Sequence, residues 1–233
     1  MRVEDLRRNL EVSVATIRRD LEVLEEEGKL QRVHGGAVTM EKRLEEAVFD
    51  DKTNRASKEK GRIAEEAYKL IGKGESIYLD GGSTTWGLAR LLRERTDLTL
   101  VTNSLRAAAE LADSGPKVLL IGGELRRISQ TMVGPLTSAV LGQVHVDKAF
   151  MGTMGFCLKN GLTTTDPNEA YVKKLVADQA GKVILLADSG KAEKVSFARV
   201  SDWDAVDVLV SDCKLSKLFA KSLRKRGLKV QLA

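Results

Sequence analysis

Residues suited to holding an anion follow an apolar stretch in the first half of the chain. The segment from Asp80 to Thr85 reads D-G-G-S-T-T, comes directly after 76–79 and opens a stretch with helical spacing. Glycine lets backbone N–H groups approach a ligand, hydroxyls add donors, and a helix N-terminus adds a favourable dipole. The pattern is neither a Walker loop nor G-x-G-x-x-G, so it favours a small phosphate ester over a nucleotide. A plain glycine turn with a Ser/Thr cap explains the same residues without a ligand. The residues expected to contact an anion here are Gly82, Ser83, Thr84 and Thr85.

Polar or small residues also end four further apolar runs. They are Thr102-Asn103-Ser104, Gly122-Gly123-Glu124, Gly152-Thr153 and Asp188-Ser189-Gly190-Lys191. In open α/β sheets ligands bind beyond the carboxyl ends of the strands, so these segments predict one polar pocket for a hydroxylated anion. Lys191 is the residue expected to pair with the ligand's charge, and a solvated surface lysine is the alternative. The pocket residues expected from these strand ends are Asn103, Gly122, Gly123, Gly152 and Lys191.

Two carboxylates complete the predicted pocket. Asp80 and Glu169 offer acceptors for sugar hydroxyls. Asp166, Pro167 and Glu169 stand at the N-cap, N1 and N3 positions of a predicted helix, so capping alone accounts for Glu169. The preceding loop 161–165 is also expected to be able to bring Glu169 over the pocket, and both interpretations stay open.

The first forty residues contain a pattern suited to DNA. Ser13 is a good N-cap, and apolar residues then recur at helical spacing as one buried stripe, at Val14, Ile17, Leu21 and Leu24. The opposite face carries small residues and two arginines, which fit a major groove. Gly28 ends the helix, and the alternation over 29–33 with a turn at 34–36 predicts a β-wing. An ordinary amphipathic helix and hairpin is the alternative. The expected DNA-binding residues are Ser13, Ala15, Thr16, Arg18, Arg19, Arg32, His34 and Gly35.

Helices and strands alternate from residue 58 onward. Strands are predicted at 76–80, 98–102, 117–121, 147–151, 182–187, 206–210 and 229–232. Helices are predicted at 63–71, 84–95, 105–114, 135–143, 168–179 and 217–226. Near-continuous apolar strands favour an α/β fold with a mostly parallel sheet covered on both faces. The predicted organisation is a small winged helix-turn-helix at 1–38, a linker at 39–57 and an α/β domain at 58–233.

Composition limits the classes of protein. The chain has 233 residues, 42% hydrophobic and 30% charged, with no apolar run long enough for a membrane span. The net charge of +5 lies outside the head, because residues 1–60 hold 13 basic and 14 acidic residues. Any DNA contact must therefore rest on local charges. Two distant cysteines without metal spacing indicate reduced thiols, and we expect a cytoplasmic protein without metal or cofactor.

The N-terminal run resembles the helix-turn-helix of the DeoR family of bacterial transcription regulators. The matching residues are Val12-Ser13, Thr16 to Leu21, Leu24-Glu25, Gly28, Leu30, Arg32 and His34 to Ala37. Family members usually have another helix ahead of the one predicted at 3–9, and this sequence shows none. Two interpretations stay open: the coding start lies further upstream, or the head is truncated, with Leu6, Leu10 and Ile17 left partly uncovered.

The second half resembles the sensor domain of the same family. The motifs are Asp80 to Thr85, Thr102 to Ser104, Gly122-Gly123, Asp147 to Gly152, Gly161 to Ala170 and Asp188 to Lys191. The last motif departs at Gly190, where Ser is usual, which puts one hydroxyl ligand in doubt. The resemblance implies a fold like ribose-5-phosphate isomerase and a sugar-phosphate effector.

The sequence thus predicts a regulator, expected to be a repressor, that binds operator DNA as a homo-oligomer and responds to a phosphorylated sugar. Two rivals remain. One is an isomerase-like enzyme that uses Asp80, Glu169 and Lys191 for proton transfer. The other is a sensor that has lost DNA binding through truncation.

Overall fold

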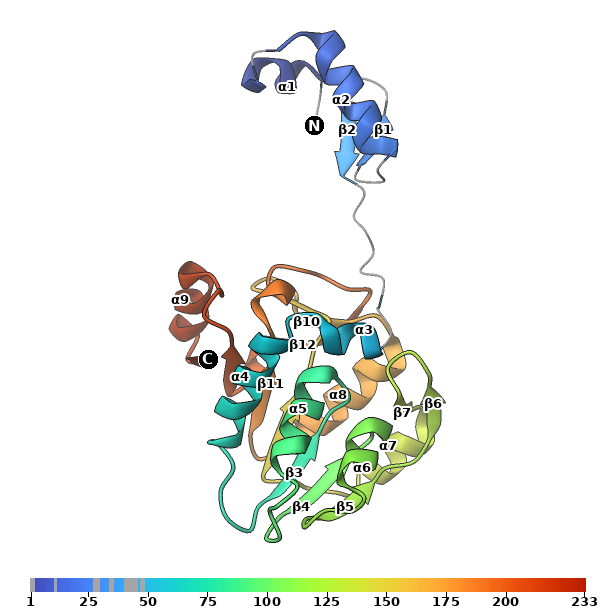
Figure 1. The fold of residues 1–233 in the computed structure, drawn as a ribbon, viewed down its shortest axis with the longest axis vertical. Helices are drawn as coiled ribbons and strands as arrows, with labels where there is room; N and C mark the ends of the chain where they lie inside the picture. Colours follow the sequence, from blue (N-terminus) through green and yellow to red (C-terminus); the bar gives the residue numbers. More distant parts are fainter. Residues whose placement is uncertain (1–2, 11, 27–29, 34–35, 40–45, 47–48) are drawn as a thin grey trace. The chain divides into compact units, whose positions relative to one another are not determined.

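The computed structural model describes residues 3–10, 12–26, 30–33, 36–39, 46 and 49–233, and the chain divides into two compact units after Arg43 (Figure 1). The first unit contains two helices and a pair of antiparallel strands. These elements are α1 (Val3–Leu10), α2 (Val14–Glu26), β1 (Leu30–Val33) and β2 (Gly36–Thr39). The predicted helix and wing are therefore present among the described residues of this unit.

A small apolar core holds α1 against α2. Ile17 and Leu21 are 3% and 6% exposed and pack against Val3 and Leu6. The expectation that Ile17 would be left partly uncovered was wrong, because α1 covers it, while Leu6 is only partly buried. Leu10 is 59% exposed, as expected for a residue beyond the reach of this packing.

The second unit is built on a seven-stranded parallel sheet with the order β14-β13-β11-β8-β3-β4-β5. Its strands are β3 (Ser76–Leu79), β4 (Thr99–Thr102), β5 (Lys117–Leu120), β8 (Lys148–Met151), β11 (Val183–Leu186), β13 (Val208–Ser211) and β14 (Lys229–Leu232). Each overlaps a predicted strand, and the predicted parallel arrangement is confirmed. Strands β3, β8 and β11 are neighbours in the middle of the sheet.

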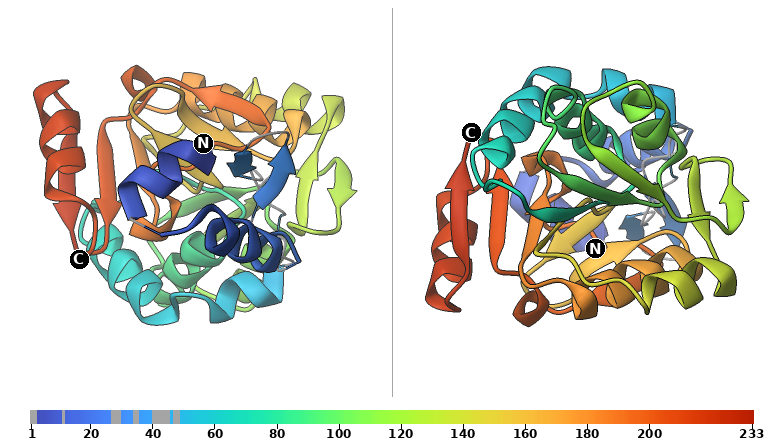
Figure 2. Two further views of the ribbon diagram at one scale, coloured as in Figure 1. Left: turned by 90° about the horizontal axis from the view of Figure 1, so that it is seen from above. Right: turned by 90° about the horizontal axis from the view of Figure 1, so that it is seen from below.

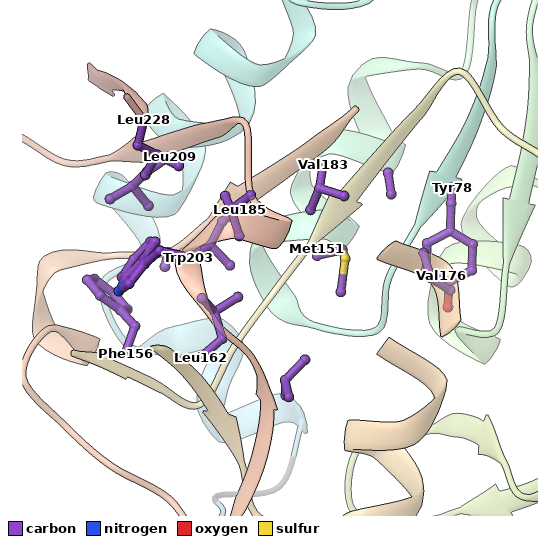
Figure 3. Packing of buried hydrophobic residues seen from close by; sticks show 14 of the residues in the cluster. Tyr78, Met151, Phe156, Leu162, Val176, Val183, Leu185, Trp203, Leu209 and Leu228 are labelled. Atoms are coloured by element: carbon purple, nitrogen blue, oxygen red, sulfur yellow. The ribbon is translucent and has the colours of Figure 1, made fainter. Parts of the chain in front are cut away.

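Helices cover both faces of this sheet, as Figure 2 shows. One face is covered by α4 (Ser57–Tyr68), α5 (Ser83–Leu91) and α6 (Leu105–Leu111), and the other by α7 (Pro135–Leu141), α8 (Pro167–Gln179) and α9 (Lys217–Lys225). Side chains of β3 alternate between the two cores, with Ile77 and Leu79 on the first face and Tyr78 on the second. Figure 3 shows Tyr78, Met151 and Leu185 in this second core. Burial on both faces explains why the strands read as continuous apolar runs.

Several short elements lie outside the predicted pattern. A three-stranded antiparallel sheet joins β12 (Ala198–Ser201), β10 (Gly161–Thr164) and β9 (Gly155–Cys157), and β6 (Glu124–Arg126) pairs with β7 (Thr131–Val133). Two 3₁₀ turns are η1 (Ser189–Lys191) and η2 (Trp203–Ala205). The expected loop at 161–165 is therefore mostly strand β10. Strands of three or four residues are too short to show a period of two.

The predicted linker at 39–57 contains structure. Helix α3 (Phe49–Asn54) lies within it, and the second unit begins at Leu44. Phe49 is 3% exposed and meets the Trp86 ring edge-on, with the ring centroids 6.2 Å apart. The later part of the expected linker thus belongs to the α/β unit. None of the described helices is long and apolar enough to cross a membrane.

Candidate functional site

A cavity of about 290 Å³ lies at the carboxyl ends of the three central strands β3, β8 and β11. Its walls come from the loops after these strands, from α8, and from the segment that leads through α3 into α4. Seven of the expected effector residues line it: Gly82, Ser83, Thr84, Thr85, Gly152, Glu169 and Lys191. The structure therefore brings together residues that are far apart in the sequence.

The loop after β3 is closed by its own hydrogen bonds. Thr85 Oγ1 donates to the backbone oxygens of Asp80, at 2.7 Å, and Gly82, at 2.9 Å. Gly81 lies so close to Thr131 of β7 that a Cβ atom would collide with the Thr131 methyl group. This packing places the first turn of α5 at the cavity wall, where its N–H groups have no acceptor within the helix. Such a turn is suited to an anion.

A buried ion pair lies beneath the cavity. Asp80 is 3% exposed, and its Oδ2 accepts hydrogen bonds from Lys173 Nζ and from the Gly152 backbone N–H, the latter at 2.8 Å. Burial alone lowers the pKa of Lys173, but attraction to Asp80 and Glu169 outweighs burial and raises it above its usual value. The pair ties the ends of β3 and β8 to α8. Asp80 is thus engaged with protein groups rather than lining the cavity.

Lys191 lies at the end of η1 and donates to the Thr153 carbonyl at 2.8 Å. Burial, together with the charges of Lys60, Lys52 and Lys173, lowers the pKa of Lys191 to about 8 against the opposing effect of Asp188. Burial also lowers the pKa of Lys60, which lines the same cavity. An anion in the cavity would relieve the repulsion among these ammonium groups.

Glu169 stands at the N3 position of a capped helix and also lines the cavity. Its backbone N–H donates to Asp166 Oδ1 at 2.9 Å, which confirms the predicted cap. Its carboxylate accepts from Thr164 Oγ1 at 2.7 Å, and the residue also lines the cavity. Capping and a place in the cavity wall are therefore compatible.

Besides Asp80, three expected site residues lie outside the cavity: Asn103, Gly122 and Gly123. Strands β4 and β5 lie on the far side of β3, and the carboxyl end of β4 is held by the β6–β7 hairpin. Asn103 accepts from the Tyr78 hydroxyl at 2.7 Å and donates to the Met132 carbonyl at 2.8 Å. The Gly122 carbonyl accepts from Thr137 Oγ1 at 2.9 Å. These residues hold the hairpin and α7 in place.

Several charged residues at the site were not predicted from the sequence. Glu46, Lys52, Lys60 and Lys173 all line the cavity. Lys173 follows Glu169 by four residues on α8, so helical spacing places both on one face, and this signal was available. No local pattern marks Glu46 or Lys52, because they reach the cavity only through the tertiary packing of α3.

Glu46 has a side chain only 4% exposed, between two cations. Its carboxylate accepts from Lys52 Nζ at 2.6 Å, from Arg126 Nη2 at 2.5 Å and from Thr165 Oγ1. Burial alone raises the pKa of Glu46, but Arg126 and Lys52 outweigh burial and lower it to about 2. Glu46 is therefore ionised across the physiological pH range.

The predicted DNA-binding face is exposed on α2. Ala15, Thr16, Arg18 and Arg19 are exposed, and Ser13 Oγ accepts from the Thr16 backbone N–H at 3.1 Å, which confirms the predicted N-cap. The Arg32 backbone belongs to β1, while the Arg32 side chain lies outside what the structure describes. His34 and Gly35 also lie outside the described residues.

An exposed helix with two arginines and a strand-end cavity with lysines define a regulator that pairs a DNA-binding head with a sensor. The DeoR-like helix-turn-helix domain matches residues 1–43, and the DeoR C terminal sensor domain matches residues 55–213. The chain belongs to the DeoR family of transcriptional regulators.

Two relatives illustrate this membership. The chain is 36% identical over 232 residues to the HTH-type transcriptional regulator GolR of Listeria innocua, covering 99% of this chain and 91% of the relative. It is 34% identical over 226 residues to the lactose phosphotransferase system repressor of Streptococcus mutans, covering 94% and 89%.

Two solved structures are similar to this chain at low sequence identity. The δ subunit of eIF2B from Chaetomium thermophilum matches with a TM-score of 0.51 and 17% identity, over 69% of this chain and 58% of that one. Ribose 5-phosphate isomerase A from Methanocaldococcus jannaschii matches with a TM-score of 0.43 and 22% identity, over 57% and 53%.

The Asp80–Lys173 pair predicts a strong effect on stability. Asp80→Asn should lower the free energy of unfolding by about 3–5 kcal/mol, because it leaves the Lys173 ammonium buried without its counter-charge. Urea denaturation followed by circular dichroism measures this. The double variant Asp80→Asn/Lys173→Met should recover most of the loss, and an unchanged midpoint for the single variant would show that the pair is not needed.

Proposed function

We propose that this regulator represses genes of sugar metabolism and is controlled by a phosphorylated sugar that binds in the cavity. Binding would shift the chain between arrangements that hold operator DNA and arrangements that do not, which requires different affinities of the sugar for the two. We place this activity in the cytoplasm. The name of one relative, the lactose phosphotransferase system repressor, supports a role in sugar metabolism.

The observation that carries the ligand proposal is the composition of the cavity wall. The first turn of α5 and the ammonium groups of Lys60 and Lys191 meet at one cavity. This combination suits a phosphate monoester. The Glu169 carboxylate on the same wall supplies an acceptor for a sugar hydroxyl.

We propose a sensor rather than an enzyme. Proton transfer between sugar carbons needs a carboxylate base free to face the substrate. Of the two carboxylates that the sequence offered for this, Asp80 is bonded to Lys173 and the Gly152 N–H instead of lining the cavity, which leaves Glu169 alone. The cavity therefore favours binding over catalysis.

We also propose that the chain acts as a homo-oligomer. Two heads can engage two half-sites, which adds affinity and reads a palindrome or a repeat. Sedimentation equilibrium of the full chain tests this, and a monomer at all concentrations would contradict it.

The effector proposal predicts selective stabilisation by phosphorylated sugars. In a thermal-shift screen of paired sugars and sugar phosphates, at least one phosphorylated member should raise the Tm well above its free sugar, because charge-assisted bonds carry much of the affinity. Lys191→Ala should abolish this difference. Lys214→Met, which removes a lysine paired with Glu59 on the surface, should leave it intact.

Other outcomes of the screen have clear meanings. Stabilisation by a nucleotide or a free sugar alone would contradict the anion cavity. If NMR shows that a bound sugar phosphate is converted to its isomer, the protein would be an enzyme and the sensor proposal would be wrong.

The lowered pKa of Lys191 predicts how effector affinity depends on pH. Below about pH 8 the Lys191 amine is already charged, and above it binding must take up a proton, so the Kd should rise. A phosphate monoester loses part of its negative charge below its second pKa of about 6. Binding should therefore be tightest between that pH and the pKa of Lys191, about 8. Calorimetry from pH 5.5 to pH 9 measures both limits, and Lys191→Met should remove the alkaline one.

The exposed face of α2 predicts the effect of losing Arg19. With DNA that the full chain selects from a random library, Arg19→Ala should weaken binding by about 1–3 kcal/mol if Arg19 contacts a base, or lower the salt slope by about one if it contacts phosphate. Gel-shift titrations at several salt concentrations separate these. Arg62→Ala, on exposed α4 surface, is the matched control. Unchanged affinity would exclude Arg19 from the DNA interface. If the chain selects no DNA from the library, the protein is a sensor that has lost DNA binding.

A further inference from the structure

Residues 44–54 lie between the two matched family domains, which end at 43 and begin at 55. Three of its described residues, Glu46, Phe49 and Lys52, nevertheless line the cavity. The same segment leads directly from the last residue of the N-terminal unit, Arg43, into the sensor. It is therefore both part of the site and the covalent connection to the head.

Helix α3 is docked on the elements that form the anion end of the cavity. The Lys52 carbonyl accepts from Lys60 Nζ and, at 3.4 Å, from Ser83 Oγ. Ser83 begins α5, and Lys60 is one of the buried lysines. A ligand bound at the start of α5 would thus meet groups that hold α3 in place.

Lys52 is shared between the segment and the cavity. Its ammonium pairs with the buried Glu46 carboxylate at 2.6 Å, while Lys52 also lines the cavity together with Lys60 and Lys191. The Lys52 charge is close enough to act on the pKa of both of these lysines. Glu46 therefore supplies negative charge at the edge of a group of cations that an anionic ligand would also approach.

We propose that Glu46 is an internal competitor of the effector: an anion in the cavity draws Lys52 away from Glu46 and so loosens the segment that leads to the DNA-binding unit. This inference rests on the proposed function, since it assumes that the cavity takes an anion. It assigns the regulation of that site to residues outside both matched domains. The coupling is reciprocal, so weakening the Glu46–Lys52 pair must tighten anion binding.

The first experiment uses the full chain and inorganic phosphate. Hydrogen–deuterium exchange should become faster at residues 49–54 when phosphate is added, and slower in the first turn of α5. Slower exchange at 49–54 would mean that this wall closes on the anion, which overturns the competition. Calorimetry that detects no phosphate binding to the unaltered chain would overturn the proposed function together with this inference.

The second experiment is a double-mutant cycle on phosphate affinity. Glu46→Gln should tighten binding by about 5-fold or more, because it removes the competing charge with little change of shape. Lys52→Met should weaken binding, and Glu46→Gln should have a smaller effect in the Lys52→Met background than in the unaltered chain. Glu75→Gln, which removes a carboxylate paired with Lys148 outside the cavity wall, is the matched control and should leave affinity unchanged.

The cycle separates the two proposals. If phosphate binds and Glu46→Gln changes affinity equally in both backgrounds, or not at all, the competition is overturned while the anion site stands. Urea denaturation of every variant shows whether the fold is retained. If Glu46→Gln does not fold, the decision rests on the direction of exchange at residues 49–54 in the unaltered chain.

Discussion

The buried pair of Asp80 and Lys173 is the interaction on which the site depends. Taking both charges out of water is unfavourable, and it is tolerated only because Asp80 also accepts from the Gly152 N–H and Lys173 is close to the Glu169 charge. These bonds connect the end of β3, the end of β8 and the middle of α8. Parallel pairing already joins the carboxyl ends of β3 and β8, and the ion pair adds the middle of α8 to them. The arrangement of these strand ends and α8 determines the shape of the cavity.

The buried lysines of the cavity differ in how far a counter-charge offsets their burial. Lys173 has a full counter-charge below, so its pKa is raised. Lys60 and Lys191 have less compensation, and burial lowers the pKa of both. Buried cations with so little compensation lower stability, and perturbed pKa values of this kind cluster at functional sites. The contrast supports a structural role for Asp80 and Lys173 and the proposed ligand role for Lys60 and Lys191.

The features that could be predicted from the sequence are those that repeat along the chain or follow a local rule. The seven parallel strands were visible because burial on both faces makes them continuously apolar, and the Asp166 cap because capping is local. Cavity residues directly after β3, β8 and β11 followed from the strand-end rule. The rule failed at Asn103, because the sequence does not state the order of strands. Glu46 and Lys52 could not be predicted, because only tertiary packing of α3 brings them to the cavity.

The reason that Glu46 and Lys52 could not be predicted is physical, and it bears on regulation. Periodic and capping patterns report interactions that hold in every state of the molecule, whereas regulation needs a contact that differs between states. A pair such as Glu46 and Lys52 is suited to this, since a ligand charge can replace one partner without disturbing either apolar core. Moving an equilibrium from 1:99 to 99:1 requires about 5.5 kcal/mol of differential binding. One partly buried ion pair cannot supply all of that, so several exchanged contacts, or several subunits, must share the change.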